Sequence, residues 1–464
     1  MKLSEIRKSA SQFVQDKLSK KSWFLRAAGA LAGGTAIAQI ITLLALPIVT
    51  RIYTPKEFGV LAIFISILTS FSAISCMRFE IAIPVPEKDG DAANLMALAL
   101  VICLAISLIS GVILLLAQNH ILNFLGNQDI AKYLWLIPVS IAILGFYSAL
   151  QFWSVRKKRY GAIVRTRFKQ SFGGSATQIL LGWLGWGGAG LILGYLVNSA
   201  AGILGFGRQI FREDKDSLKK IRLKKMREIG GKYIKYPKYS VLEVLATNSA
   251  VQLPIIIMAA SVSSTEVGFV LLASRVIAAP VGLIGGAISQ VYLSSAPKNF
   301  REGKLVEFTL YVINQIIKIG AGPLCFLGMI SPMVFPLVFG NDWRRAGMLL
   351  AWMTPWFLLQ MIATAIAMAL HVTDNQKAAL GANIAGFVIR AGGVGAAAVV
   401  VPSIASEVYA VSGFLFYSLY LATILVKLDI NFISLVKAVH KNCKPLILWI
   451  SVAILIDVLL WSAS

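Results

Sequence analysis

The sequence contains one short motif twice, as TPKEFGVLAIF (54–64) and SSTEVGFVLLA (263–273). The copies lie 209 residues apart, and aligning them pairs Glu57 with Glu266 and Gly59 with Gly268. Each copy is predicted to begin the second helix of a six-helix block. Six membrane helices return the chain to its starting side, so two such blocks insert in the same orientation. The motif therefore predicts two parallel halves, with a ligand site between them.

Composition indicates the environment in which these helices fold. Of the 464 residues, 57% are hydrophobic and only 14% are charged, and the mean hydropathy is +0.76. Such values exclude a water-soluble domain of this length and indicate a polytopic membrane protein. A spanning helix needs about 20 apolar residues. Thirteen spans are predicted, at 27–50, 58–83, 92–117, 131–153, 163–186, 188–208, 236–260, 266–294, 309–338, 347–370, 379–401, 405–427 and 445–462.

The predicted fold is an all-α polytopic membrane protein with two six-helix lobes in parallel pseudo-repeat and one appended C-terminal helix. The predicted segments are a basic N-terminal segment (1–26), an N-lobe (27–208), a basic linker (209–235), a C-lobe (236–427) and a C-terminal part (428–464). The last part combines an amphipathic stretch, DINFISLVKAVHKNCK (429–444), with the thirteenth span.

Basic residues predict the orientation. With the N-terminus in the cytoplasm, 35 of the 44 Lys and Arg residues fall on the cytoplasmic side and five fall outside, which agrees with the positive-inside rule at every alternate loop. The run LKKIRLKKMREIGGKYIKYPK (218–238) is interpreted as topogenic and lipid-facing, so anionic membrane lipids are predicted partners and nucleic acid is not. The four Cys and three His residues show no metal-ligand spacing, and no cofactor is predicted.

Charges inside the predicted spans indicate a site. The cations among them are Arg78, Arg275, Lys318 and Arg390. Arg78 and Glu80 lie in SAISCMRFEIAIPV (72–85), and side chains two positions apart on a helix point about 200° from one another, so they are not expected to pair. Arg275 should lie about 13 Å along its helix, near the bilayer centre. A charge there costs at least ~2.5 kcal/mol, so Arg275, Lys318 and Arg390 are predicted to face water, a partner or an anion. Snorkelling to the headgroups is the alternative for Arg78 and Glu80.

Few acidic residues lie within the spans to neutralise these cations. Glu80 and Glu243 are the main candidates, and a weak hypothesis makes them carboxylates that couple transport to H+ or Na+. Excess positive charge predicts an anionic ligand, because Arg grips phosphate oxygens through its planar fork. Arg78, Arg275, Lys318 and Arg390 are therefore the predicted substrate-binding residues. Arg165, Arg167 and Lys169 are interpreted either as topogenic or as a cytoplasmic entrance for a phosphorylated headgroup.

The chain resembles the polysaccharide-transporter branch of the MOP flippase superfamily, which includes Wzx-type O-antigen and capsule-unit flippases. The resemblance rests on ALPIVTRIYTPKEFGVLAIFISI (45–67), MRFEIAIPVPEKDGDAANL (77–95), FWSVRKKRYGAIVRTRFKQS (152–171) and GLILGY (190–195). It implies a bilobed bundle of twelve core helices with a cationic cavity. Such a bundle moves an undecaprenyl-pyrophosphate-linked oligosaccharide from the cytoplasmic to the periplasmic leaflet of the bacterial inner membrane. The resemblance also implies a role in lipopolysaccharide or capsule biosynthesis, beside a polysaccharide polymerase and chain-length proteins.

Two other function classes fit a polytopic chain. A MATE-type cation-coupled exporter relies on membrane-embedded carboxylates, which the first predicted helix lacks, and it is kept as the alternative. A membrane glycosyltransferase or polymerase typically needs a sizeable external catalytic loop, whereas the longest one predicted here, around 118–130, has about a dozen residues. We therefore predict a transporter and no enzymatic activity.

Overall fold

Helices form every regular element of the chain that the structure describes. The computed structural model describes residues 33–125, 128–431, 433 and 443–463, and no strand occurs in these ranges. Eleven of the described helices are long and apolar enough to cross a membrane. The prediction of an all-α polytopic membrane protein is therefore confirmed. The N-terminal segment 1–26 and most of the amphipathic stretch 429–444 lie outside the described residues.

The N-terminal half of the chain contributes six long helices. Their bounds are Gly33–Ile52 for the first helix, Pro55–Ser72 for α2, Asp89–Leu125 for α3, Leu136–Arg156 for α4, Tyr160–Trp183 for α5 and Gly188–Glu213 for α6. Short 3-10 turns lie at Glu80–Ala82 (η1) and Gln128–Tyr133 (η2). The predicted break between the fifth and sixth spans is confirmed, since Gly185 and Gly187 adopt φ values of 76° and 53° between α5 and α6. Positive φ ends α5 there, because glycine enters this backbone region at little cost.

The basic linker is largely helical and leads into the second half. It contains α7 (Lys215–Leu218) and α8 (Leu223–Lys232), and the π-helical turn η3 (Tyr236–Ser240) follows it. The second half then comprises α9 (Val241–Ser261), α10 (Ser264–Arg301), α11 (Leu305–Ile316), η4 (Ile317–Ala321), α12 (Gly322–Phe339), η5 (Asn341–Trp343), α13 (Arg344–Ile366), α14 (Met368–Val372), α15 (Gln376–Phe387), η6 (Val388–Gly392), α16 (Gly393–Val400), η7 (Pro402–Ile404) and α17 (Ala405–Lys427). Beyond α17, α19 (Cys443–Ala463) packs along α12.

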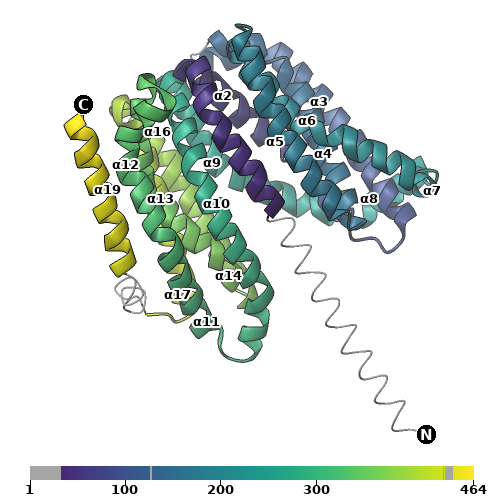
Figure 1. The fold of residues 1–464 in the computed structure, drawn as a ribbon. Helices are drawn as coiled ribbons and strands as arrows, with labels where there is room; N and C mark the ends of the chain where they lie inside the picture. The colour runs from purple at the N-terminus through teal and green to yellow at the C-terminus, as the bar shows by residue number, and fades with distance from the viewer. Residues whose placement is uncertain (1–32, 126–127, 432, 434–442, 464) are drawn as a thin grey trace.

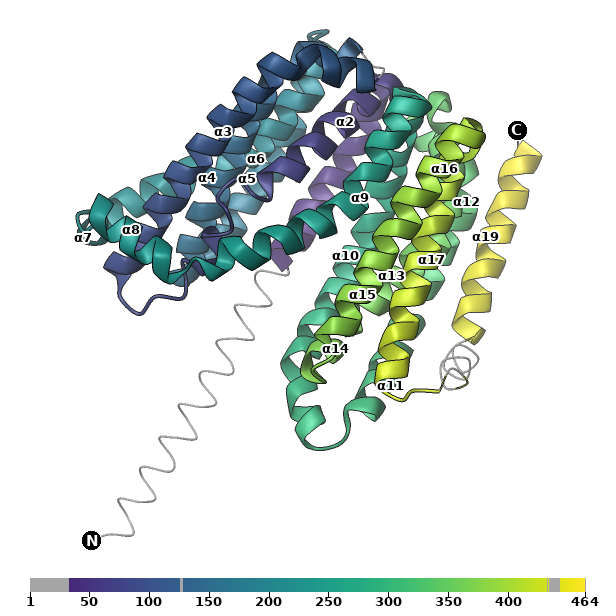
Figure 2. The same ribbon diagram turned by 180° about the vertical axis from the view of Figure 1, so that it is seen from behind.

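The long helices gather in two groups, one from each half of the chain (Figures 1 and 2). We call the end where α5 begins and α7 and α8 lie the basic end, and the end where α2 and α10 begin the opposite end. The groups lie nearest to one another at the opposite end and diverge toward the basic end (Figure 1). The first helix runs between them (Figure 1).

Contact between the groups depends on the repeated motif. Thr54 caps α2 with its side chain and forms a capping box with Glu57, and Ser263 caps α10 by accepting a hydrogen bond from the backbone of Glu266. The two helix starts then pack backbone against backbone. A Cβ atom on Gly59 would overlap the carbonyl oxygen of Ser264, and one on Gly268 would overlap the carbonyl oxygen of Pro55. The aligned glycines are therefore the positions at which α2 and α10 meet.

Other contacts tie the two groups together at the opposite end. The indole Nε1 of Trp343 donates a 3.0 Å hydrogen bond to the carbonyl of Thr50, and Arg51 donates one of 3.1 Å to the carbonyl of Leu337. The ring of Phe58 packs edge-on against Trp343 with centroids 4.8 Å apart. These bonds join the first helix and α2 to η5 and α12, so this end of the bundle is held closed.

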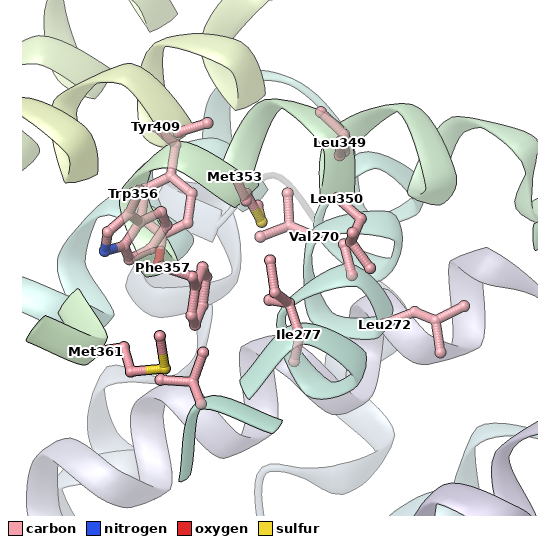
Figure 3. Close-up of a cluster of buried hydrophobic side chains, with 14 of the residues drawn as sticks. Val270, Leu272, Ile277, Leu349, Leu350, Met353, Trp356, Phe357, Met361 and Tyr409 are labelled. Carbon is pink, nitrogen blue, oxygen red and sulfur yellow. The ribbon is translucent and has the colours of Figure 1, made fainter. Parts of the chain in front are cut away.

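One apolar core runs through both groups, and in the second group it lies where α10, α13 and α17 pack together (Figure 3). Ile277, Met353 and Met361 are completely buried there. An ion-pair chain fixes the same three helices at the opposite end: Arg345 lies 2.8 Å from Glu266 and 2.6 Å from Glu407. The second motif copy thus begins a helix that is rigidly held within its own group.

The second predicted span was wrong at its C-terminal end. It was expected to continue to residue 83, but α2 ends at Ser72 and turns follow. Met77 and Arg78 adopt φ values of 51° and 61°, a left-handed conformation that interrupts a helix. The apolar composition of 72–85 gave no sign of this break, because buried turns here are as apolar as the helix before them.

We predict that Gly59→Ala lowers the unfolding temperature of the detergent-solubilised protein. Its new methyl group must displace the backbone of α10, and overpacking of this kind typically costs about 1–3 kcal/mol. The matched control is Gly286→Ala on α10, where an added Cβ meets nothing within 4 Å. The control should unfold at or above the parent temperature, since Ala favours helix over Gly. Equal unfolding temperatures for Gly59→Ala and Gly286→Ala would contradict the close contact.

Candidate functional site

A cavity of about 340 Å³ lies between the two helix groups. The first helix, α5 and α6 line it from the first group, and α10 lines it from the second. Its lining residues are Gln39, Thr42, Leu43, Leu46, Gly174, Ser175, Gln178, Gly194, Tyr195, Asn198, Arg275, Ala278 and Ala279. Among these described residues one is a cation and none is an acid.

Arg275 reaches this cavity because of its position relative to the motif. It follows Gly268 by seven residues, which is two helical turns, so it lies on the face of α10 that meets the first group. Arg275 has no ion pair or hydrogen bond with another described residue, and Tyr195 on α6 lies close enough to interact with its charge. The equivalent position in the first motif copy is Ser66, which is buried. Of these two equivalent positions, only the one on α10 therefore carries a positive charge.

Uncharged polar groups complete the cavity wall. The side chain of Gln178 donates a 3.2 Å hydrogen bond to the backbone carbonyl of Leu191. The backbone carbonyl of Gln178 accepts one of 2.7 Å from the hydroxyl of Tyr53. Gln39 and Asn198 also line the cavity. Amide side chains of this kind can donate to and accept from hydroxyl groups. The cavity therefore combines one guanidinium that has no acidic partner among the described residues with groups suited to a hydroxylated, anionic molecule.

Arg390 was predicted to share this site, but the structure places it within the second group. Only 3% of Arg390 is exposed, and its guanidinium carbon lies 4.5 Å from the ring centre of Trp356 and 5.1 Å from that of Tyr409. These contacts are cation–π interactions. Its Nε and Nη2 atoms have no hydrogen-bond partner among the described residues. Arg390 is thus a buried cation held by aromatic faces rather than by an acid.

Lys318 and Glu243 both belong to the second half of the chain. Lys318 is exposed and is absent from the lining of the cavity that holds Arg275. It lies in the π-helical turn η4, just as Arg390 lies in η6. Two of the predicted intramembrane cations thus fall in widened helix turns, a geometry that often occurs at functional sites. Glu243 belongs to α9, but its side chain is outside the described part.

Arg78 and Glu80 form an ion pair, although side chains two positions apart on a continuous helix point away from each other. Arg78 Nη1 lies 3.4 Å from Glu80 Oε1. The expectation of no pairing was wrong because the helix ends at Ser72, and the left-handed residues Met77 and Arg78 redirect the chain. Glu80 is buried rather than snorkelling, and neither residue lines the cavity of Arg275.

Arg156 joins the stretches 77–95 and 152–171, which are two of those that carry the family resemblance. Its guanidinium lies 2.9 Å from Asp89 and donates to the carbonyls of Ile83, Pro84, Pro86 and Glu87. Lys157 lies 2.5 Å from the same carboxylate. One side chain at the end of α4 thus clamps the whole loop between α2 and α3. These residues stabilise the fold of the basic end. The sequence analysis had counted Arg156 and Lys157 only among the basic residues that predict orientation.

Arg159 anchors the start of α5 in a similar way. It donates hydrogen bonds of 2.7 and 2.9 Å to Asp214, which also accepts one of 2.9 Å from the indole of Trp153. Burial alone would raise the pKa of Asp214, but the hydrogen bonds from Arg159 and Trp153 outweigh it and lower that pKa. Asp214 is therefore a buried, charged anchor for α4, α5 and α6.

The predicted entrance residues divide between two sides of α5. Arg165 and Lys169 line a basic groove of about 570 Å³ at the ends of α5 and α6. Arg167 instead donates a hydrogen bond to Thr35 on the first helix. Arg208 and Arg212 complete the groove, although the sequence had assigned them only a topogenic role. Their four-residue spacing, repeated in Arg165 and Lys169, was the signal that places each pair on one helix face.

A family model described as "Polysaccharide biosynthesis protein" matches residues 48–347. No curated protein matches. Among solved structures, the chain is similar to lipid II flippase MurJ in an inward closed conformation, with 14% identity, a TM-score of 0.66, and coverage of 93% of this chain and 97% of that one.

Two further solved structures share the fold. An inward-facing multidrug resistance MATE family transporter of the MOP superfamily is 15% identical with a TM-score of 0.65, covering 84% of this chain and 94% of that one. A MOP superfamily transporter from Pyrococcus furiosus, whose description reports a binding pocket of reverse polarity, is 14% identical with a TM-score of 0.51, covering 90% and 96%. At these identities the likeness establishes the fold.

We predict that Glu80 makes the protein less stable as pH rises. Burial raises the pKa of this carboxyl, although a backbone hydrogen bond and the charge of Arg78 oppose the rise. The folded state therefore holds a proton that the unfolded chain releases near pH ~4.3. Stability should fall as pH increases from there through the raised pKa, because the carboxyl must then be buried as an anion.

Thermal unfolding measured across that pH range checks this expectation. Glu80→Gln should remove part of the decline, because the amide does not titrate. The control is Glu87→Gln in the same loop, where the side chain is exposed. An unchanged decline in Glu80→Gln would show that Glu80 is not the titrating group.

Proposed function

Because the chain belongs to the polysaccharide biosynthesis protein family of the MOP flippase superfamily, we propose that it translocates a lipid-linked oligosaccharide. The proposed passenger is an undecaprenyl-pyrophosphate-linked O-antigen or capsule repeat unit, moved from the cytoplasmic to the periplasmic leaflet of the bacterial inner membrane. A polysaccharide polymerase and chain-length proteins are the proposed pathway partners.

One observation carries the proposal, namely that Arg275 lies in the cavity between the two groups without an ion pair to any described residue. A guanidinium matches the geometry of phosphate oxygens and can donate two parallel hydrogen bonds to them. The amides of Gln39, Gln178 and Asn198 would meet sugar hydroxyls beside it. An anion that carries hydroxyl groups thus fits the cavity better than a cation does.

The arrangement of the helix groups supports alternating access. We assign the basic end to the cytoplasm by the positive-inside rule, with the N-terminus on that side. The opposite end is held by the contact of Gly59 with Ser264 and by the bond from Trp343 to Thr50. Rocking of the two groups against each other about the central cavity would bring their basic ends together. It would part the opposite ends, which requires these contacts to break. The polyprenyl tail would stay in lipid between helices while the pyrophosphate and glycan cross.

The remaining charges receive supporting roles in this proposal. Arg390, buried between aromatic rings, would add to the positive potential of the second group without touching the passenger. Arg78 and Lys318 stay candidate contacts in conformations other than the present one. Glu80 and Glu243 stay candidate carboxylates for coupling to H+ or Na+.

A MATE-type exporter of cationic molecules is the alternative within the same fold. Its cavity would need a carboxylate to attract the cargo, and the lining described here supplies a cation instead. Uptake of a cationic dye by vesicles that contain the protein would favour that alternative over the flippase.

Reconstitution of the protein with a lipid-linked oligosaccharide tests the proposal. Transfer between leaflets should fall roughly 10- to 100-fold in Arg275→Gln, since a hydrogen bond to a charged group contributes about 1.5–3 kcal/mol. The transfer rate of Arg275→Lys should lie between those of the parent and Arg275→Gln, because lysine keeps the charge but lacks the planar fork.

The control for this experiment is Arg344→Gln, an exposed arginine at the opposite end. It should transfer the lipid at the parent rate, and all variants should match the parent in unfolding temperature. Parent-level transfer by Arg275→Gln would refute the assigned site.

A further inference from the structure

A second basic site lies at the basic end, in the groove between α5 and α6. The groove has a volume of about 570 Å³. Its basic lining residues are Lys158, Arg159, Arg165, Lys169, Arg208 and Arg212, and Glu213 is its one acid among the described residues. Arg159 is already neutralised by Asp214 and Glu213. Arg165, Lys169, Arg208 and Arg212 have no ion pair with any described residue, so the groove carries a net positive charge.

Small residues make the groove concave. Gly161 and Ala162 on α5 face Ala201 and Gly205 on α6 along its lining. A Cβ atom on Gly161 would meet nothing within 4 Å, and one on Gly205 would only reach van der Waals contact, 3.9 Å from Thr166. The floor is therefore open backbone, with long cationic side chains around it. Such a shape admits a group about the size of a phosphate ester.

Exposed apolar side chains border the groove toward the middle of the membrane. Phe168 and Phe172 stack in parallel on α5, and 61% of Phe172 is exposed. On α6, 81% of Leu204 is exposed. Cationic groups beside bilayer-facing apolar groups match the two parts of a lipid, namely a phosphorylated headgroup and its acyl chains.

The groove is separate from the cavity that holds Arg275. Lys169 precedes Gln178 by nine residues, which is two and a half helical turns, so these side chains point to opposite sides of α5. Arg167, which bonds to the first helix, lies on the cavity side. On α6, Asn198 of the cavity and Gly205 of the groove are seven residues apart and share one helix face. The two sites have no lining residue in common, so a molecule in the groove leaves the cavity itself free.

We propose that this groove is a binding site for the headgroup of an anionic glycerophospholipid from the leaflet at the basic end. Arg165 and Lys169 from α5 and Arg208 and Arg212 from α6 hold the phosphate, and the acyl chains lie along Phe168, Phe172 and Leu204. The lipid joins the ends of α5 and α6 and stays bound while the cavity on the other side of α5 loads and empties.

Native mass spectrometry of the full chain in detergent tests this site by titration with phosphatidylglycerol, phosphatidylcholine and inorganic phosphate. The parent should retain phosphatidylglycerol in preference to phosphatidylcholine. The double variant Arg165→Gln, Lys169→Gln should bind phosphatidylglycerol more weakly, by roughly fivefold for each cation removed. Gly205→Leu should weaken binding as well, because it fills the groove and leaves every charge in place.

The matched control is Arg301→Gln, Lys304→Gln, which removes one arginine and one lysine from exposed positions at the basic end of the second group. It should bind phosphatidylglycerol as the parent does. Parent-like binding by the double variant or by Gly205→Leu would overturn the site, and displacement of the lipid by inorganic phosphate would overturn its assignment to a lipid. The readout is binding, so it is independent of whether the proposed transport occurs.

Discussion

The backbone contact between α2 and α10 is the constraint on which the rest of this structure depends. Gly59 lies against the carbonyl of Ser264 and Gly268 against that of Pro55, so no side chain separates the two helices there. This approach brings the two groups together at the opposite end and fixes which face of α10 turns toward the first group. Arg275, two turns beyond Gly268, is on that face. One pair of glycines thus decides both how the halves meet and where the cavity places its charge.

The cations of this protein serve three different physical purposes. Arg156 and Arg159 are satisfied by carboxylates and carbonyl groups and hold the loops of the basic end. Arg390 is held by aromatic rings inside the second group. Arg275 has neither kind of partner among the described residues and faces a cavity. Arg275 and Arg390 both lie inside hydrophobic spans, so that location alone did not reveal their roles. The environment of each guanidinium distinguishes them.

The sequence alone predicted the all-helical membrane fold, because that fold follows from hydropathy. Arg275 lies nine residues after Glu266 in a regular helix, as the sequence predicts. The prediction failed at Arg78 and Glu80 because left-handed turns in an apolar stretch leave hydropathy unchanged. It could not separate Arg390 from Arg275, since the distinction comes from Trp356 and Tyr409 on other helices. Long-range packing of this kind has no signature in the spacing of residues along the chain.

Photo-crosslinking from position 278 tests the central claim most directly. Ala278 lines the cavity beside Arg275, whereas Leu108 on α3 is exposed on the surface of the first group. A photoreactive side chain placed at 278 should capture a lipid-linked oligosaccharide more strongly than one placed at 108, and Arg275→Gln should abolish only the capture at 278. Equal capture at both positions, unaffected by Arg275→Gln, would show that the passenger does not enter the cavity.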